Sequence, residues 1–248
     1  MIKYGWKRDK YDYRDLKYFL TAPIKVPDTW DLRKNDDNIL NQGSLGSCVA
    51  NGFSGMIDSL LKSNKKISIS PSRLFTYYNC RVLINTVKKD SGAYVRDSIK
   101  SGVNLGMVSE TLYPYIIPKF KNKPPVNVYK EALKIKVTEY RRVNNLVLTE
   151  LKSAICQGYP IIFGMDVYGS FESEEVKRTG IVSLPAPKED LLGGHCMLIV
   201  GYTKDNFIVK NSWGTEWGDK GYCYIPFEYL TSPKLADDFW IVTKLNVL

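Results

Sequence analysis

The chain has 248 residues, of which 44% are hydrophobic and 25% charged, and its formal net charge is +9. This composition is that of a globular protein that can bury a core without disulfides or metal, which excludes disordered and fibrous classes. The sequence holds neither the run of about 20 apolar residues that a membrane-spanning helix needs nor the apolar stretch of a secretory signal near its start. We therefore expect no membrane span and a cytoplasmic or non-classically delivered protein.

The charged residues and the cysteines argue against two classes of site. Basic and acidic residues alternate, as in the segment Trp6-Lys7-Arg8-Asp9-Lys10, whereas a nucleic-acid interface needs its positive charge gathered in one patch. The 5 cysteines contain no C-x-x-C pair and the chain has 1 histidine, which does not provide four zinc ligands at the usual spacing. We expect a solvated surface, no nucleic-acid partner, no metal and no cofactor.

The first half of the chain predicts helices. Residues 1–25 are aromatic and charged without a helical or strand period, so this extension needs contact with the rest of the chain to become ordered. Ser70 and Pro71, as cap and first residue, predict the start of a second helix, and a third is expected over about residues 93–100. The first helix is predicted from apolar residues three and four positions apart, ending near residues 62–64: Cys48, Val49, Phe53, Met56, Ile57, Leu60 and Leu61.

The pattern changes after residues 123–125, which read Lys-Pro-Pro. One helix is predicted over 148–156 and a hairpin turn over 204–206. Strands are predicted over 161–167, 196–202, 207–209, 221–225 and 239–245. The chain therefore predicts an α+β fold with an extension (1–25), a mainly helical lobe (26–125) and a sheet-rich lobe (126–248). A cleft between two such lobes is a natural place for a substrate.

Cys48 is the first candidate for chemistry. It lies in the first turn of its predicted helix, where the helix dipole favours an anion and lowers the pKa of a thiol. The tight loop before it, residues 41–47, contains two glycines and directs the sulfur toward an opening. The alternative is a small hydrophobic side chain on a buried helix face.

His195 and Asn211 are the candidates that would assist such a thiol. His195 is the only imidazole in the chain and follows Gly193-Gly194, two glycines that allow another chain to approach closely. Asn211 ends a predicted strand, where it either caps a turn or accepts a hydrogen bond from the imidazole. In the second case Trp213 would shield that hydrogen bond from water. Each residue alone is compatible with a purely structural role.

Together the motifs resemble those of the papain family of cysteine peptidases. Residues 42–48 (QGSLGSC) resemble its nucleophile loop, residues 194–202 (GHCMLIVGY) its histidine strand and residues 209–222 (VKNSWGTEWGDKGY) its asparagine segment. The order of the three is that of the family, and the 147 positions between Cys48 and His195 agree with its spacing. Residues 27–33 resemble the start of a mature enzyme, so the resemblance runs from about residue 26 to the C-terminus.

This resemblance implies a fold, an activity and a site. The fold would have a helical left lobe and a β-barrel-like right lobe with the active-site cleft between them. The activity would be that of a cysteine endopeptidase that forms an acyl-enzyme thioester on protein or peptide substrates, acting as a monomer. The implied catalytic residues are Cys48, His195, Asn211 and Gln42, the last as an oxyanion donor, and the implied substrate-binding residues are Trp213, Gly92, Ala93 and Gly194.

The chain also departs from the family. Leu45 stands where the family often has a disulfide cysteine, which leaves Cys80 without a partner and favours tolerance of a reducing environment. An apolar or aromatic substrate side chain is expected in a pocket of Phe163, Cys196 and Trp240. The absence of a spare histidine argues against the carboxydipeptidases of the family.

The family's long helical pro-region is also missing, and residues 4–9 resemble minimal microbial and viral members. Residues 1–25 either lie in or near the cleft and restrain activity, as in a zymogen, or merely pack on the surface.

Three other functions compete with peptide hydrolysis. An inactive papain-like binding module usually loses the nucleophile or the base, and both are present here. A transglutaminase or a ubiquitin-type isopeptidase shares Cys–His chemistry but does not usually have the Asn-Ser-Trp-Gly segment. Nucleic-acid binding through the +9 charge would show as steep salt dependence.

Overall fold

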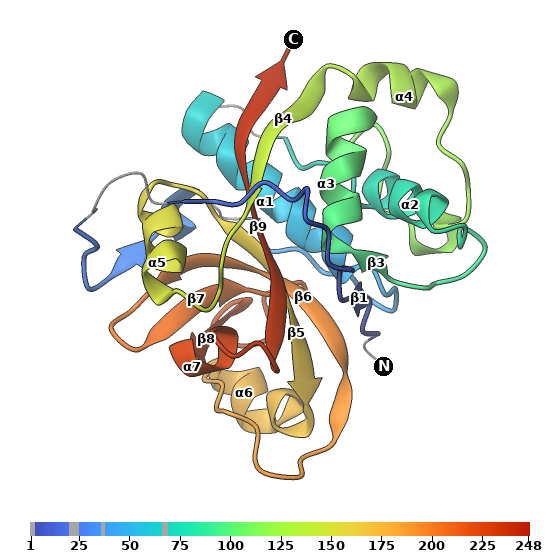
Figure 1. Cartoon of the computed structure of the whole chain (residues 1–248). Coiled ribbons are helices and arrows are strands. Elements are labelled where there is room, and N and C mark those ends of the chain that lie inside the picture. Colours follow the sequence, from blue (N-terminus) through green and yellow to red (C-terminus); the bar gives the residue numbers. More distant parts are fainter. Residues whose placement is uncertain (1–2, 20–24, 36–37, 66–68) are drawn as a thin grey trace.

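A computed structural model of the protein describes residues 3–19, 25–35, 38–65 and 69–248. Helices fill one side of the molecule and an antiparallel sheet the other (Figure 1). The predicted α+β class is confirmed. No helix within these four described ranges is long and apolar enough to cross a membrane.

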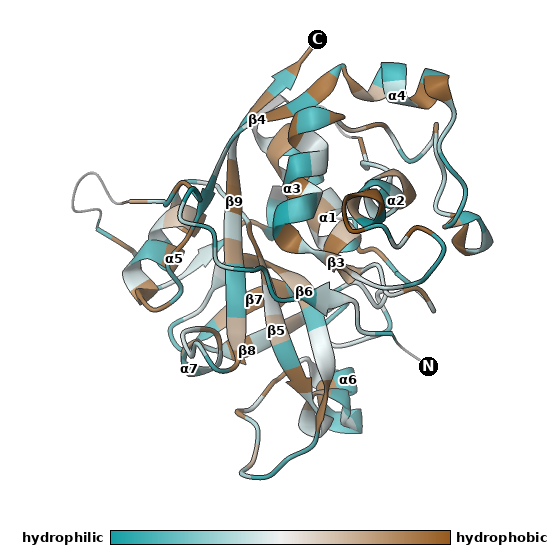
Figure 2. Cartoon of the chain, turned by 45° about the vertical axis from the view of Figure 1, so that its right-hand side comes forward, coloured by the Kyte–Doolittle hydropathy of each residue, from teal (hydrophilic) through white to brown (hydrophobic). Residues whose placement is uncertain are grey.

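The helical lobe is built around α1 (Cys48–Lys65), which begins at the candidate nucleophile as predicted. Its apolar side chains are completely buried, because α1 contacts α2 (Arg73–Leu83) and α3 (Val95–Asn104) on one side and the sheet strand β6 (Leu191–Tyr202) on the other. Figure 2 shows hydrophobic segments along α1, α2 and the central strands, where the lobes meet. The helix that carries Cys48 is therefore held by both lobes.

The second and third predicted helices of this lobe exist, but both start later than predicted. The cap of α2 is Ser72, whose hydroxyl accepts the Phe75 N–H at 3.2 Å, whereas Pro71 lies before the helix and bridges to Ser109. The third helix starts two residues later than predicted, because Ala93–Tyr94 form a strand, β3, beside β1 (Trp6–Lys7). A further helix, α4 (Val126–Ala132), was not predicted.

The second lobe is an antiparallel sheet whose strands follow the order β4-β9-β5-β6-β7-β8, with β2 (Trp30–Asp31) paired to β6. The predicted helix at 148–156 is α5 (Leu148–Cys156), and the hairpin is confirmed by the Thr203 N–H, which donates to the Asn206 carbonyl at 2.8 Å. The remaining strands are β4 (Ile135–Arg142), β5 (Ile161–Tyr168), β7 (Asn206–Lys210), β8 (Tyr222–Pro226) and β9 (Ala236–Val247). Two short helices complete the lobe: α6 (Glu174–Thr179) and α7 (Phe227–Leu230).

Alternation along β5 and β6 separates two hydrophobic cores. Phe163 and Met197 face one another and point into the core of the sheet lobe. Gly164 and Cys196, one position further along each strand, face α1 and the cleft side. A shift of one residue therefore decides whether a side chain on these strands reaches the cleft or the far core.

The N-terminal segment crosses both lobes (Figure 1). We call residues 3–8 the strap and residues 9–19 the anchor. The strap includes β1, which pairs in parallel with β3 of the helical lobe. The anchor runs beside β4, where the Tyr18 N–H donates to the Arg142 carbonyl and the Arg142 N–H to the Leu16 carbonyl, both at 2.8 Å. Residues 1–2 and 20–24 of the predicted extension lie outside the described residues.

Candidate active site

Cys48 lies at the first position of α1 and is fully buried. Burial raises the pKa of the Cys48 thiol to about 11, because the loss of water disfavours the thiolate more than the backbone groups of Cys196 and Gly5 favour it. The predicted low thiol pKa is therefore wrong for this covered form of the chain.

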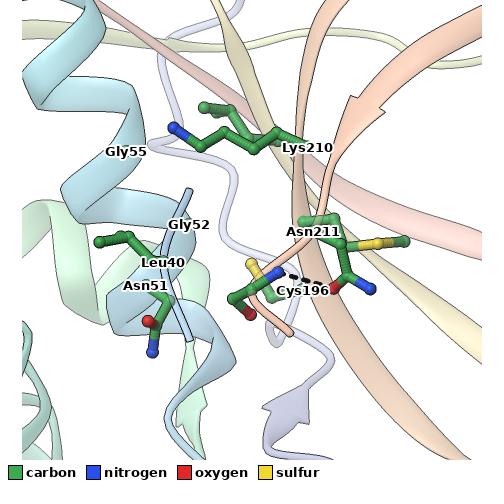
Figure 3. Close-up of a pocket in the computed structure, with 10 residues that line it drawn as sticks. Leu40, Asn51, Gly52, Gly55, Cys196, Lys210 and Asn211 are labelled. Atoms are coloured by element: carbon green, nitrogen blue, oxygen red, sulfur yellow. Dashed lines mark hydrogen bonds between the residues drawn. The ribbon is translucent and has the colours of Figure 1, made fainter. Parts of the chain in front are cut away.

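His195 and Asn211 are bonded as predicted. The His195 Nε2–H donates to Asn211 Oδ1 at 2.8 Å. The same oxygen accepts the Ser212 backbone N–H at 2.8 Å, and Figure 3 shows this second bond as a dashed line to Asn211. Since Nε2 carries the proton, the neutral ring keeps its lone pair on Nδ1. That atom is buried without a hydrogen-bond partner among the described residues. Burial lowers the pKa of His195 to about 4, although the Asn211 bond acts in the opposite direction.

Aromatic rings enclose the imidazole. The Trp213 ring lies 4.9 Å from the His195 ring, centroid to centroid, at an interplanar angle of 30°. Phe171 and Trp217 pack edge-on against Trp213 at 5.5 and 5.1 Å and keep it in place. The predicted shielding of the His195–Asn211 bond by Trp213 agrees with this stack.

Gln42 is buried, with both ends of its side-chain amide bonded. Nε2 donates to the carbonyls of Lys3 and Leu45, each at 3.0 Å, and Oε1 accepts the Ser212 hydroxyl at 2.8 Å. Ser212 thus fixes which way the Gln42 amide points, a role that the sequence analysis missed. Its only signal in the sequence is its place between Asn211 and Trp213.

A small cavity of about 10 Å³ lies beside the site, between α1, the strand that carries Cys196 and Asn211, which directly follows β7 (Figure 3). This is about the volume that one water molecule requires. The Cys196 sulfur points to this side, 3.3 Å from where a Cβ on Gly52 would stand.

The strap lies over this site. The Lys3 carbonyl is bonded to Gln42, the Tyr4 ring stands 6.0 Å from the His195 ring, and the Gly5 carbonyl accepts the Ala93 N–H at 2.8 Å.

The glycines expected to admit another chain do admit the strap. A Cβ on Gly193 would lie 2.9 Å from Tyr4 Cβ, a Cβ on Gly194 2.7 Å from the Trp6 ring, and a Cβ on Gly92 would overlap the Gly5 carbonyl. The four residues predicted to bind substrate contact the strap: Gly92, Ala93, Gly194 and Trp213.

The assignment of Phe163 to the predicted specificity pocket was wrong. Phe163 stacks on Phe239 at 5.2 Å inside the sheet-lobe core, and Cys196 faces α1. The space beside the cleft is instead filled by the Trp6 ring, which a Cβ on Gly164 would overlap. The Trp6 indole N–H donates to Asp238 Oδ2 at 3.0 Å. For Phe163 the error is one residue along β5, which inverts the face, whereas Cys196 lies on the cleft side with Gly164.

All 5 cysteines are unpaired. Leu45 and Cys80, the positions of the disulfide expected from the family, are both buried in the core around α1. Apolar packing thus replaces the cross-link.

The chain is similar to known proteins over nearly its whole length. The model of the papain family cysteine proteases matches residues 26–234. An uncharacterized peptidase C1-like protein of Acanthamoeba polyphaga mimivirus is 38% identical, over 97% of this chain and 84% of its own length. The crystal structure of xylellain, a cysteine protease from Xylella fastidiosa, covers 97% of this chain and 96% of its own at 34% identity and a TM-score of 0.88.

Cathepsin S of Bos taurus is 28% identical over 84% of this chain, which spans 62% of the cathepsin's length. The family model covers far more than half of the chain, and two relatives above 30% identity cover nearly all of it. The fold is the two-lobe α+β fold of these structures. The chain belongs to the papain family of cysteine proteases.

Proposed function

We propose that this protein is a cysteine endopeptidase that hydrolyses peptide bonds through a thioester on Cys48. The observation that carries the proposal is the convergence of Cys48 at the start of α1, the His195–Asn211 bond of 2.8 Å and the buried Gln42 amide that already holds a peptide carbonyl at 3.0 Å. An endopeptidase is favoured over a carboxydipeptidase because the only histidine is engaged with Asn211.

In the first half of the proposed reaction, Cys48 passes its thiol proton to His195 Nδ1, and the resulting thiolate attacks the carbonyl carbon of the scissile bond. The carbonyl oxygen takes up negative charge and is held by the Gln42 side-chain amide and the Cys48 backbone N–H. His195 Nδ1 then gives its proton to the leaving nitrogen, the C–N bond breaks and a thioester remains. Asn211 holds Nε2 throughout, so that Nδ1 is the nitrogen that exchanges the proton.

In the second half, water attacks the thioester. His195, now neutral, accepts a proton from the water, and the C–S bond breaks to release the acid and a thiolate. The thiolate takes the proton back from His195, which restores the thiol. Trp213 covers the His195–Asn211 bond on the solvent side, which strengthens it by excluding water.

The test is modification by an epoxide inhibitor of papain-like peptidases, followed by intact-mass analysis. We expect one adduct that is absent in Cys48→Ala and retained in Cys156→Ala, the matched control, since Cys156 is the only cysteine that is not fully buried. An adduct that persists in Cys48→Ala would contradict the assignment of the nucleophile.

We further propose that the strap restrains this activity. It occupies the Gln42 amide, the β3 edge and the glycines beside His195, which a substrate would need. It also removes water from Cys48 and His195, whose pKa values then favour a neutral thiol and a neutral imidazole at neutral pH rather than the reactive ion pair.

Gly5→Ala tests the restraint, because it changes the strap and leaves the residues of the two lobes as they are. A Cβ on Gly5 would overlap the Gly46 carbonyl in the covered form but is harmless once the strap has left. Overpacking costs about 1–3 kcal/mol, so we expect epoxide modification to become about tenfold faster or more. Gly169→Ala, where a Cβ meets nothing closer than 3.7 Å, is the matched control. An unchanged rate in Gly5→Ala would contradict the restraint.

The anchor should be kept in any truncation. Asp15 pairs with Arg96 at 2.6 Å, the Trp240 indole N–H donates to Asp9 at 3.1 Å, and Tyr18 is buried in the sheet-lobe core. Removal of residues 2–8 therefore uncovers the cleft, whereas removal of residues 1–25 also strips partners from buried groups. We expect only the longer truncation to lower the melting temperature markedly.

A further inference from the structure

Several strap residues contact carboxylates of the rest of the protein. At the start of the strap, Lys3 Nζ lies 3.1 Å from Asp90 Oδ2, next to the nucleophile loop. Further along, the Trp6 indole N–H donates to the buried Asp238 at 3.0 Å. Both contacts place an N–H donor of the strap on a carboxylate of the cleft wall.

The end of the strap brings a full positive charge to the same wall. The Arg8 guanidinium lies 3.6 Å from Asp166 and 3.9 Å from Asp237, and it stacks over the Trp6 ring at 5.5 Å. Three carboxylates, those of Asp166, Asp237 and Asp238, thus surround two strap residues.

Outside the strap, one positively charged side chain among the described residues contacts any of these three carboxylates. Arg142 lies 3.1 Å from Asp238 and 2.7 Å from Asp237. When Arg8 leaves, one guanidinium remains for three carboxylates.

The negative charge of this cleft wall is opposite to the positive net charge of the whole chain. The protein has 35 lysines and arginines against 26 acidic residues, so a cationic peptide would be repelled by most of its surface. The cleft wall is the exception, because its acidic groups contact the strap. The strap is a peptide segment whose lysine, tryptophan and arginine side chains make these contacts.

We infer that the cleft, once the strap has left it, prefers peptide segments that carry arginine or lysine, and that Asp238 and Asp90 determine this preference. The inference rests on the proposed peptidase function and names its substrate class. Gly164 and Gly194 leave room for the flat Trp6 ring, and a planar guanidinium fits the same space with five N–H donors. Asp238 should have the larger effect, because it is buried, whereas Lys3 is largely exposed and such surface pairs contribute little.

The test uses the full chain with Gly5→Ala and fluorogenic peptides in matched pairs. The members of a pair differ only in arginine against citrulline, its uncharged counterpart of the same shape, placed in turn at each position around the scissile bond. We expect kcat/KM to favour arginine about tenfold or more at one position, as for a well-buried charge pair. The preference should weaken as salt is added.

Two substitutions in the Gly5→Ala chain assign the preference. Asp238→Asn keeps the shape and suits the left-handed backbone at this position (φ 59°), and we expect it to bring the arginine-to-citrulline ratio close to one. Asp90→Asn should lower the ratio less. Asp205→Asn, an exposed turn residue, removes the same charge far from the cleft and should leave the ratio unchanged. If Asp238→Asn does not fold, Asp90→Asn and the salt series still decide the question.

The outcomes separate this inference from the proposed function. Cleavage of both peptides at equal rates, or a preference for tryptophan or leucine over arginine, overturns the inference and leaves the peptidase standing. A Gly5→Ala chain that reacts with the epoxide but cleaves no peptide overturns both.

Discussion

The Trp6 indole N–H donates to Asp238 Oδ2 at 3.0 Å although the two residues are 232 positions apart in the chain. The bond joins the first strand to the last one and holds the Trp6 ring in the space beside Gly164. Neither residue belongs to the segments that carry the candidate catalytic residues.

Ser212→Ala should impair the Gln42 amide without removing it. The buried Oε1 would lose its hydroxyl donor at 2.8 Å, and the side chain would no longer be fixed in one orientation. We expect kcat to fall about tenfold, less than the roughly 10²–10³ of a lost oxyanion donor in Gln42→Ala. Steady-state kinetics of both variants checks this order. Equal losses in both would mean that Ser212 does more than orient the amide.

The single histidine makes the imidazole easy to titrate. Burial lowers the pKa of His195 to about 4 in the covered chain, because an imidazolium is disfavoured without water. Gly5→Ala should move this pKa upward, since it readmits water to the ring. Proton NMR of the His195 ring measures its pKa in the native chain, in Gly5→Ala and in the control Gly169→Ala. The same pKa in all three chains would show that the strap does not govern the environment of His195.

The thiol should respond in the opposite direction. In the covered form, burial raises the pKa of the Cys48 thiol to about 11, so this form binds the thiol proton more tightly than the open form does. Protonation of Cys48 therefore stabilises strap docking fully below the thiol pKa of the open form. This stabilisation is lost as the pH rises toward 11. We expect alkylation by iodoacetamide to increase only at strongly alkaline pH in the native chain and at lower pH in Gly5→Ala. Identical pH profiles would contradict this linkage.

Gly164→Ala tests the strap from the body side. The added Cβ would overlap the Trp6 ring, whereas a displaced strap leaves it exposed to solvent. Epoxide modification should therefore speed up as it does in Gly5→Ala. The two substitutions combined should add little, because each already excludes the covered form. Additive acceleration would show that Gly164 and Gly5 act on separate events.

Phe163→Ala should act on stability rather than on the pocket. Phe163 is fully buried and stacks on Phe239 at 5.2 Å, so its removal leaves a cavity in the sheet-lobe core. We expect a loss of about 3–5 kcal/mol in the free energy of unfolding, and a smaller loss in Phe163→Leu. Urea unfolding measures both. A change of substrate preference in Phe163→Leu would restore Phe163 to the specificity pocket.

The family and the α+β class could be read from the sequence, and so could the candidate catalytic residues Cys48, His195, Asn211 and Gln42. These are local signals: a 3.6-residue period over α1, and short motifs whose residue types each have a chemical reason. The Gly193-Gly194 pair even indicated that another chain approaches His195, as Tyr4 and Trp6 do.

The tertiary structure alone decided which chain lies in the cleft and what it touches. Residues 3–8 follow no period, because their order comes from Ala93, Gly194 and Asp238, which lie far away in the sequence. Phe163 was misassigned to the pocket for a related reason: alternation along a strand identifies two faces but not which of them meets the other lobe. Burial shifts the pKa values of Cys48 and His195, and burial depends on what covers a residue rather than on its neighbours in the chain.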